Sequence, residues 1–288
     1  MAAQHDGGAR PAGGPTVPEG APGVAPVAGP RRRLGRLERL ALAGVMTREV
    51  INWLSFWRSS TFSSTVEPTI YLLAFGFGFG TLVSEVGGFD YVDFVGTGTV
   101  ATAVLFSSAF PGMFGTFVKH RFQRTYDAIL AAPVDVEELV TAEALWIAVR
   151  AGVYGCTPML VAMAFGLDPS PGMLLVPLVA FVTGFGFACF GVLVAALVSA
   201  IENFNYIVSA VLTPLFLVAG TFFPIDRLPE WAQVAAEFNP LHHCVELVRH
   251  CVFGFEPGTD ALRVLALLVF AIALWRIAIN RMQVRLID

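Results

Sequence analysis

Two apolar stretches separated by a short connection decide the fold of this chain. The first is MLLVPLVAFVTGFGFACFGVLVAALVS, residues 173–199, and the second is FNYIVSAVLTPLFLVAGTFF, residues 204–223. Neither contains Asp, Glu, Lys or Arg. Because a bilayer core of about 30 Å needs roughly 20 apolar helical residues per crossing, each stretch predicts a transmembrane helix. The connection, residues 200–203, is too short for anything but a tight helical hairpin.

The composition of the whole chain agrees with residence in a membrane. Of its 288 residues, 56% are hydrophobic and 14% are charged, whereas an ordinary globular protein has roughly 25% charged residues. These values exclude a disordered regulator, a nucleic-acid binder and a secreted disulfide scaffold as the main identity of the protein.

The same length criterion selects four further spans. They are residues 63–83, 92–118, 139–165 and 261–279. The sequence therefore predicts an all-α membrane protein with six transmembrane helices.

The first 58 residues are predicted to lie outside the membrane core. Residues 1–33 form an expected disordered cytoplasmic tail, because seven Gly and six Pro fall within residues 1–30 and leave little apolar surface to bury. Residues 34–58 mix charged and apolar side chains, and Trp53 and Trp57 share one helix face, as interfacial anchors do. We expect an amphipathic helix on the cytoplasmic membrane surface, with a solvated helix packed on its own domain as the alternative.

The positions of the basic residues predict that both termini are cytoplasmic. With six spans, the inner side receives the arginines of residues 31–58, followed by Lys119, Arg121, Arg124, Arg276, Arg281 and Arg285. The outer side receives Arg227, Arg249 and Arg263. Residues 284–288 then form a short cytoplasmic C-terminus.

The segment between the fifth and sixth spans does not fit a simple hairpin. Two short apolar runs, residues 231–238 and 241–253, are interrupted at Asn239 and Pro240. Each run is too short to cross the membrane, so residues 225–253 predict a re-entrant or interfacial helical hairpin on the outer side.

A cluster of His and Cys in this hairpin invites a metal-site interpretation, which the spacing does not support. The cluster consists of His242, His243, Cys244, His250 and Cys251. Helical residues seven apart are separated by about 10.5 Å of rise, too far for one zinc ion with ligand bonds of about 2.0–2.3 Å. The same rise opposes a disulfide between Cys244 and Cys251. We expect no metal site, and favour polar contacts or a lining role for these side chains.

Among the charged residues within the predicted spans, Glu67, Glu143 and Arg150 are of most interest. Charges in the membrane are costly and usually face protein or water. Glu143 and Arg150, seven apart on one helix face, are interpreted as a structural pair bridged through a neighbouring helix or as part of a proton relay. A relay usually needs further carboxylates, which the spans do not supply.

The chain contains a single lysine, and its position excludes one source of energy within this polypeptide. A phosphate-binding P-loop ends in G-K-[ST], whereas Lys119 lies between Val118 and His120. If ATP drives the protein, the ATPase is a separate polypeptide.

The loop that begins at Lys119 and ends at Glu138 is the most organised polar segment. Residues 121–130 predict a helix of two to three turns that ends before Pro133. Asp135, Glu137 and Glu138 then occupy the first turn of the next helix, where the helix dipole favours acidic residues. Such a helix has the form of a docking element, and a solvated elbow is the alternative.

Several of these stretches resemble the ABC-2 type transporter permeases, and among them the NodJ-like lipo-oligosaccharide exporters and daunorubicin-resistance-type permeases. The matching stretches are EPTIYLLAFG at residues 67–76, YDAILAAP at 126–133, GTFFPIDRLPEW at 220–231 and NPLHHCVELVR at 239–249. The resemblance covers about residues 36–283, and the transmembrane domain that it implies comprises residues 59–283.

The resemblance implies a non-catalytic permease subunit in the bacterial inner membrane. Such a chain forms a homodimer and binds two copies of an ABC ATP-binding subunit, which holds ATP and Mg, so no cofactor or catalytic residue is expected here. The implied substrate is an amphiphile exported from the cytoplasm: a glycolipid, lipo-oligosaccharide, polysaccharide precursor or hydrophobic drug.

The resemblance also implies two functional segments. The helix that couples to the ATPase would carry Arg121, Phe122, Arg124, Thr125, Tyr126, Asp127, Ile129, Leu130 and Pro133. The outer gate would carry Pro224, Asp226, Pro229, Trp231, Asn239, Pro240, His242, Glu246 and Arg249. Asn239 stands where relatives often have Leu, and His243 stands where they usually have a small or apolar residue. These departures leave the identity of the substrate undetermined by the resemblance.

Two other classes of function compete with this interpretation. An ion-coupled secondary transporter would show inverted repeats, helices broken at mid-membrane and coupling carboxylates, which the sequence lacks. A membrane-embedded enzyme could use His242, Glu246 and Asp226 as acid and base, but no nucleophile elbow or metal spacing accompanies them.

Overall fold

The computed structural model describes residues 39–287 apart from residues 81, 84 and 87. The predicted tail, residues 1–33, and the start of the predicted amphipathic helix, residues 34–38, lie outside the described residues, as does the side chain of Glu67. The description below concerns the compact unit Leu37–Asp288 by itself.

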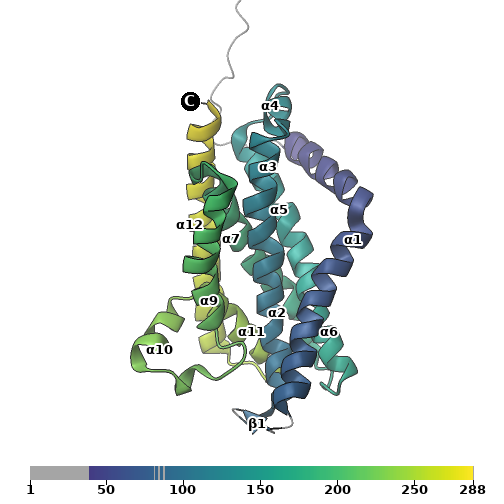
Figure 1. Ribbon diagram of the computed structural model, residues 1–288, viewed down its shortest axis with the longest axis vertical. Helices are drawn as coiled ribbons and strands as arrows, with labels where there is room; N and C mark the ends of the chain where they lie inside the picture. The colour runs from purple at the N-terminus through teal and green to yellow at the C-terminus, as the bar shows by residue number, and fades with distance from the viewer. Residues whose placement is uncertain (1–38, 81, 84, 87, 288) are drawn as a thin grey trace, which may run out of the picture. The chain divides into compact units, whose positions relative to one another are not determined.

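The first helix, α1 (Arg39–Gly80), joins the predicted amphipathic helix and the predicted first span, which we expected to be separate. A kink lies at Phe56, where φ is -134° and ψ is 20°. Residues 57–62 contain no Pro or Gly that would end the helix, so the chain bends and continues (Figure 1). The part that follows the kink is about 36 Å long at 1.5 Å per residue.

A short antiparallel hairpin, β1 (Glu85–Val86) and β2 (Phe89–Asp90), follows α1. Gly88 takes a φ of +85° in its turn, a conformation that glycine adopts without steric cost. The Asp90 side chain then caps the next helix by accepting a hydrogen bond of 2.9 Å from the Val92 N–H.

The predicted second span comprises α2 (Tyr91–Phe110), the π-helical turn η1 (Pro111–Gly115) and α3 (Thr116–Arg121). Pro111 lacks an N–H donor, which accounts for the wide turn. Two glycines allow this turn to approach α7 closely: a Cβ atom on Gly112 would lie 2.7 Å from the Ala188 carbonyl oxygen, and one on Gly191 would lie 2.6 Å from that of Ala109.

The predicted third and fourth spans are each made of two consecutive helices. The third consists of α5 (Val136–Gly155) and α6 (Thr157–Ala164), which part at Cys156 just before Pro158. The fourth consists of the 3₁₀ turn η2 (Pro171–Leu175) and α7 (Val176–Leu197). Helix α7 packs against α2, α5 and α12 and is therefore central to the bundle.

The predicted fifth span ends earlier than expected. Its helical turns are η3 (Ile201–Asn203), α8 (Phe204–Ile207), the π-helical η4 (Val208–Leu212) and α9 (Thr213–Leu217). The helix stops at Leu217 instead of residue 223, because Val218 leaves the helical region and Gly220 takes a φ of +84°.

The predicted break at Asn239 and Pro240 is confirmed. After the 3₁₀ turn η5 (Ile225–Arg227), α10 (Glu230–Glu237) and α11 (Pro240–Phe253) correspond to the two short runs expected there. The last helix, α12 (Pro257–Ile287), continues beyond the predicted end at residue 279.

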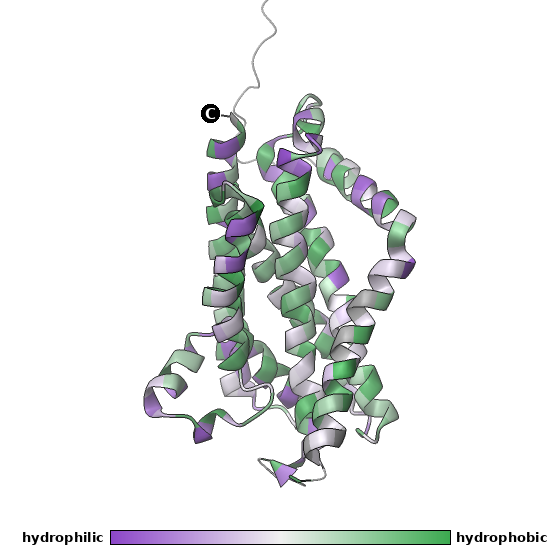
Figure 2. Cartoon of the chain, viewed as in Figure 1, coloured by the Kyte–Doolittle hydropathy of each residue, from purple (hydrophilic) through white to green (hydrophobic). Residues whose placement is uncertain are grey.

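Four helical segments of the described residues are long and apolar enough to cross a membrane: Tyr91–Arg121, Val136–Ala164, Pro171–Leu197 and Pro257–Leu286. A shorter apolar run is Ile201–Leu217. Hydrophobic residues dominate the middle of the bundle, while hydrophilic residues concentrate near α4 (Thr125–Leu130) and at α10 (Figure 2). The predicted all-α membrane class is thus confirmed.

Candidate functional site

A buried group of charged side chains joins three helices at the end of the bundle that carries α4. The Nζ atom of Lys119, on α3, lies 2.8 Å from Glu49 Oε2 on α1 and 2.7 Å from Glu143 Oε1 on α5. The side chains of Glu49 and Glu143 are only 8% and 3% exposed. Arg48 adds a second cation, with Nη1 2.7 Å from Glu49 Oε1. Two carboxylates are thereby matched by two cations, as burial of charge requires.

Helix α4 is attached to this group through Tyr126. The Tyr126 side chain is buried and its hydroxyl donates a hydrogen bond to Glu143 Oε2. Burial raises the pKa of Tyr126 well above its usual value, so the hydroxyl keeps its proton and stays a donor. We call Glu49, Lys119, Tyr126 and Glu143 the Lys119 node. It connects α1, α3, α4 and α5 through hydrogen bonds and ion pairs.

The predicted helix over residues 121–130 is shorter than expected. Arg121 ends α3, and Arg124 has a φ of 52° in the left-handed region, which interrupts the helical hydrogen bonds before α4 begins. Of the residues predicted for coupling, Arg121, Phe122, Arg124, Asp127 and Pro133 are exposed, Thr125, Ile129 and Leu130 are partly buried, and Tyr126 is fully buried. The segment therefore has an exposed face and one buried anchor.

Replacing Tyr126 with phenylalanine is expected to lower the free energy of unfolding by about 1–3 kcal/mol, because a buried carboxylate oxygen loses its donor. The change keeps the ring and removes only the hydroxyl. Thermal unfolding of the purified protein in detergent measures the effect. Tyr206→Phe is the matched control, since the Tyr206 side chain is 74% exposed; equal stability of the two variants would contradict the assigned bond.

Glu143 and Arg150, predicted as a pair bridged through a neighbouring helix or as part of a relay, do not contact each other directly. Glu143 is bonded to Lys119 and Tyr126, whereas Arg150 Nη2 donates to Ser60 Oγ on α1 at 2.8 Å. The two side chains share a helix face in the sequence pattern but reach different neighbours. The proton-relay alternative is not tested by these contacts.

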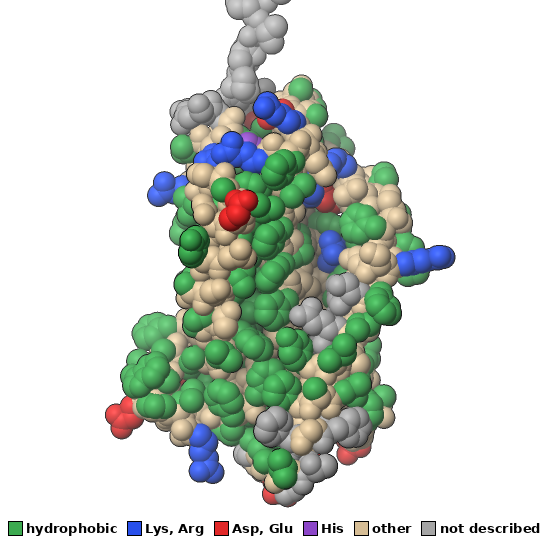
Figure 3. Space-filling view, in the orientation of Figure 1, with side chains coloured by type: hydrophobic (Ala, Val, Ile, Leu, Met, Phe, Trp, Pro, Cys, Tyr) green, Lys and Arg blue, Asp and Glu red, His purple; other side chains and the backbone are tan. Residues whose placement is uncertain are grey.

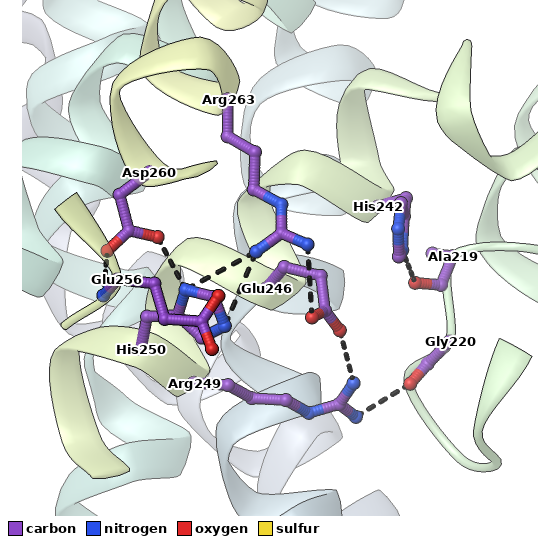
Figure 4. Close-up of polar contacts among 9 residues, drawn as sticks. All are labelled: Ala219, Gly220, His242, Glu246, Arg249, His250, Glu256, Asp260 and Arg263. Atoms are coloured by element: carbon purple, nitrogen blue, oxygen red, sulfur yellow. Dashed lines mark hydrogen bonds and ion pairs between the residues drawn. The ribbon is translucent and has the colours of Figure 1, made fainter. Parts of the chain in front are cut away.

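A second charged group lies at the opposite end of the bundle, where α11 meets α12 and the loop after α9 (Figure 4). Arg249 is central: its Nη1 lies 3.0 Å from Glu246 Oε1, and its Nη2 donates to the Gly220 carbonyl oxygen at 2.6 Å. Its guanidinium carbon also lies 3.7 Å from the centre of the Phe94 ring on α2, a cation–π arrangement. Burial lowers the pKa of Arg249 to about 10, so it stays charged at neutral pH.

The group extends from α11 to α12 through Glu246 and His250. Arg263 Nη2 lies 3.6 Å from Glu246 Oε2, and Arg263 Nη1 lies 3.3 Å from the His250 ring nitrogens. His250 Nδ1 is bonded to Asp260, whose other oxygen accepts the Glu256 N–H at 2.9 Å. Burial alone would raise the pKa of Glu246, but the positive charges of Arg249 and Arg263 hold it below its usual value. We call Glu246, Arg249, His250, Asp260 and Arg263 the outer network.

The first turn of α11 is bonded to the end of α9. Asn239 accepts a hydrogen bond from the Leu241 N–H at 2.9 Å, and its Nδ2 donates to the Leu215 carbonyl oxygen at 2.7 Å. His242 Nδ1 donates to the Ala219 carbonyl oxygen at 3.1 Å. Asn239 therefore caps one helix and holds another, and His242 makes a polar contact of the kind favoured from sequence.

The residues predicted for the outer gate are only partly brought together. Asn239, Pro240, His242, Glu246 and Arg249 lie on or beside α11, whereas Pro224, Asp226, Pro229 and Trp231 lie on or beside η5 and α10. Trp231 is 73% exposed. Sequence reasoning favoured polar contacts for His250 but missed its partners Asp260 and Arg263; the signal available for them is the concentration of charge on both sides of Gly254. Among the described residues, no group of three His, Cys, Asp or Glu could hold a metal ion.

Comparison with known proteins identifies the family of the chain. A model of the ABC-2 type transporter family matches residues 42–253. The chain belongs to this family. The ABC-2 chain is 31% identical over 257 residues to nodulation protein J of Sinorhizobium fredii, covering 85% of this chain and 98% of the relative. It is 22% identical over 244 residues to the inner membrane transport permease YadH of Escherichia coli, covering 85% and 95%.

The family match covers the sites described above except for the part of the outer network that lies on α12. It includes the whole Lys119 node and the α11 part of the outer network, and it ends at Phe253, the last residue of α11. The resemblance to NodJ-like ABC-2 permeases is therefore confirmed, and the chain is a multi-pass membrane protein. Asp260 and Arg263 on α12 lie beyond the matched residues.

Proposed function

We propose that this chain is the permease subunit of an ATP-driven exporter that moves an amphiphile out of the cytoplasm. It works with a second copy of itself and with two ABC ATP-binding subunits, which hold ATP and Mg. The substrate class includes glycolipids, lipo-oligosaccharides, polysaccharide precursors and hydrophobic drugs. The permease itself carries no catalytic site and binds no cofactor.

The proposed topology has six spans in the bacterial inner membrane. The part of α1 after the kink and the run Ile201–Leu217 are added to the four long apolar segments. On the face shown in Figure 3, most Lys and Arg side chains gather near the α4 end, which supports a cytoplasmic location for that end and for both termini. The first part of α1 then lies at the inner surface, and α10 and α11 form the outer re-entrant hairpin.

The Lys119 node is the observation that carries the coupling mechanism. The exposed face of α4 is free to contact an ATPase, while Tyr126 on its buried face is bonded to Glu143 and through Lys119 to Glu49. Because packed elements move as units and do not deform continuously, displacement of α4 is passed to α1, α3 and α5. ATP-driven closure of the partner subunits thereby becomes movement of the spans.

The outer network opposes opening of the proposed gate. It joins α11 to α12, to Phe94 on α2 and to the loop at Gly220, which keeps the proposed gate closed at rest. Export requires that movement started at α4 separates these contacts. The two charged groups thus act at opposite ends of the same spans.

Aromatic side chains support an amphiphilic cargo. Phe106, Phe110 and Phe114 follow one another along α2 and η1, and all three are partly exposed. They contact Phe216 and Phe204 on the Ile201–Leu217 run. Such a surface is weakly charged and accommodates apolar chains and the apolar faces of sugars.

A reconstituted system tests the proposed function. The permease and its ATPase are placed in vesicles with a fluorescent amphiphile, and transport is followed with ATP, without ATP, and with ATP plus an ionophore. We expect transport that requires ATP and resists the ionophore. Transport that survives ATP depletion and collapses with the ionophore would instead identify an ion-coupled secondary transporter.

Charge reversal on α4 tests the docking face. Arg124 Nη1 and Asp127 Oδ2 lie 3.7 Å apart with side chains 80% and 55% exposed, so their pair contributes little to stability. Arg124→Asp combined with Asp127→Arg is expected to lower export by about tenfold, which corresponds to roughly 1.4 kcal/mol of docking free energy. Membrane insertion and thermal stability should stay unchanged. The control Arg281→Glu reverses another exposed charge; an equal loss there would argue against α4 as the docking element.

A further inference from the structure

Arg150 is a charged residue near the middle of the span Val136–Ala164. Intramembrane charges usually pair with an opposite charge or mark the route of a substrate or ion. In the part of the chain that the structure describes, no carboxylate forms an ion pair with Arg150. Its contacts are the Ser60 hydroxyl at 2.8 Å and the face of Tyr154, whose ring centre lies 5.8 Å from the guanidinium carbon. The direct contacts of this positive charge are therefore neutral groups, and Glu49 acts on it only through longer-range electrostatic attraction.

The side chains around Arg150 are rich in hydrogen-bond donors. Trp53 Nε1 donates to the Tyr154 hydroxyl at 3.1 Å, and that hydroxyl shares a further hydrogen bond of 3.1 Å with Thr61. Ser60 accepts from Arg150 and so keeps its own proton for another acceptor. We call Trp53, Ser60, Thr61, Arg150 and Tyr154 the Arg150 cluster. It offers a guanidinium and hydroxyl groups that form no ion pair with a described carboxylate, since the nearby Glu49 is already paired with Arg48 and Lys119.

The bend of α1 determines where this cluster lies. Trp53 precedes the kink at Phe56, while Ser60 and Thr61 follow it. The surface is hollowed between α1 and the rest of the bundle beside this bend (Figure 3). Helical side chains point toward the helix N-terminus, so Arg150 extends along α5 toward the α4 end, which is the proposed cytoplasmic side. The cluster is thus placed between two helices in the inner half of the membrane.

We propose that the Arg150 cluster binds the anionic headgroup of an amphiphile in the cytoplasmic leaflet, with phosphate or a similar oxyanion as the group recognised. The guanidinium fork matches two oxygens of a phosphate, and hydroxyl groups satisfy the others. A neutral sugar would not supply the missing counter-charge. The inference rests on the proposed function, because the bound amphiphile is either cargo that awaits export or a resident phospholipid with the same headgroup chemistry.

Binding is tested with the full chain in phosphatidylcholine nanodiscs, without ATPase or ATP. The probes are dioctanoyl phosphatidic acid, dioctanoylglycerol as its phosphate-free counterpart, and inorganic phosphate. Tryptophan fluorescence reports binding, since Trp53 belongs to the cluster and Trp146 lies against it with ring centres 5.9 Å apart. We expect saturable binding of the phosphatidic acid only. Equal binding of dioctanoylglycerol, or full competition by inorganic phosphate at the same concentration, would overturn the headgroup assignment.

Variants separate a binding site from a structural lock between α1 and α5. Arg150→Gln is expected to weaken phosphatidic acid binding by about ten- to a hundredfold, the effect of losing a charged hydrogen-bond donor. Arg150→Lys keeps the charge and should give an intermediate loss, and Tyr154→Phe a smaller one. Arg281→Gln, which removes an exposed arginine from α12, should bind as the wild type does. If Arg150→Gln binds phosphatidic acid with wild-type affinity and only its thermal stability is lowered, Arg150 holds α1 to α5 and is not a binding residue.

Two further arms identify the source of the headgroup and separate the two proposals. If phosphatidylglycerol added to the nanodisc displaces the probe, the site holds a resident phospholipid; if it does not, the site selects a cargo headgroup. Because the assay contains no ATP, absence of binding overturns the Arg150 site and leaves ATP-driven export untouched. Normal binding in a chain that transports without ATP would overturn the proposed function instead.

Discussion

Replacing Lys119 with methionine is expected to lower the free energy of unfolding by about 3–5 kcal/mol and to abolish export. The two carboxylates that Lys119 joins, Glu49 and Glu143, would remain buried without the cation that lies between them. Their repulsion then separates α1 from α5 and leaves Tyr126 as the remaining bond between α4 and Glu143. Thermal unfolding in detergent and ATP-driven transport in vesicles measure the two effects.

Two further variants distinguish loss of coupling from simple unfolding. Lys119→Arg keeps the positive charge and should retain most of the stability. Combining Lys119→Met with Glu143→Gln removes one unpaired carboxylate and should recover stability, but export should stay low because α4 and α1 are no longer linked through a cation. A stable double variant with full export would show that the Lys119 node only holds the fold together.

The importance of Lys119 could not be predicted from sequence, where its uniqueness indicated only that this chain lacks a P-loop. Its partners are 70 and 24 positions away, and Ser60 is 90 positions from Arg150. Helical periodicity identifies which face a residue occupies, as for Glu143 and Arg150, but not which neighbouring helix covers that face. For this reason the shared face of Glu143 and Arg150 did not predict that Glu143 binds Lys119 and Tyr126 while Arg150 binds Ser60.

Hydrophobic length predicted the helices well and their ends less well. The charge-free stretch at 173–199 corresponds to η2 and α7, and the Asn239–Pro240 break separates α10 from α11. The kink at Phe56 lies at no Pro or Gly, so nothing in the local sequence marks it. The end of α9 at Leu217 precedes the apolar residues Phe222 and Phe223, which kept the predicted span too long. The end of α9 is instead accompanied by Gly220 at positive φ, a signal that the apolar residues around it outweighed in the length criterion.

For the coupling and gate residues, the resemblance predicted which segments matter but not which side chains contact each other. It selected Tyr126 together with exposed neighbours such as Phe122, and only the structure separates the buried anchor from the exposed face. In the outer hairpin it selected Glu246 and Arg249 but not Arg263, which lies in the following helix. The contacts that join one helix to another could not be predicted from the sequence.

Replacing Arg249 with methionine is expected to loosen the outer end of the bundle. Methionine fills much of the same volume, but the Gly220 carbonyl oxygen loses its donor and Glu246 keeps only the longer contact to Arg263. The cost is about 3–5 kcal/mol, the range for removing one partner of a buried ion pair. Because α11 is held to the α9 loop by this side chain, the hairpin should open more often even without ATP.

Thiol labelling measures that opening at a native residue. Cys244 is fully buried on α11, and burial raises its pKa to about 12, so it reacts slowly while the hairpin is packed. In a chain whose other cysteines are replaced by serine, a membrane-impermeant maleimide added from outside should label Cys244 at least about tenfold faster after Arg249→Met, the rate ratio for roughly 1.4 kcal/mol of lost closure. Arg249→Lys should label more slowly, because a cation remains beside Glu246. Arg263→Met, which removes the weaker 3.6 Å contact, is the matched control; if it opens the hairpin as much as Arg249→Met does, closure depends on α12 and not on the bond to Gly220.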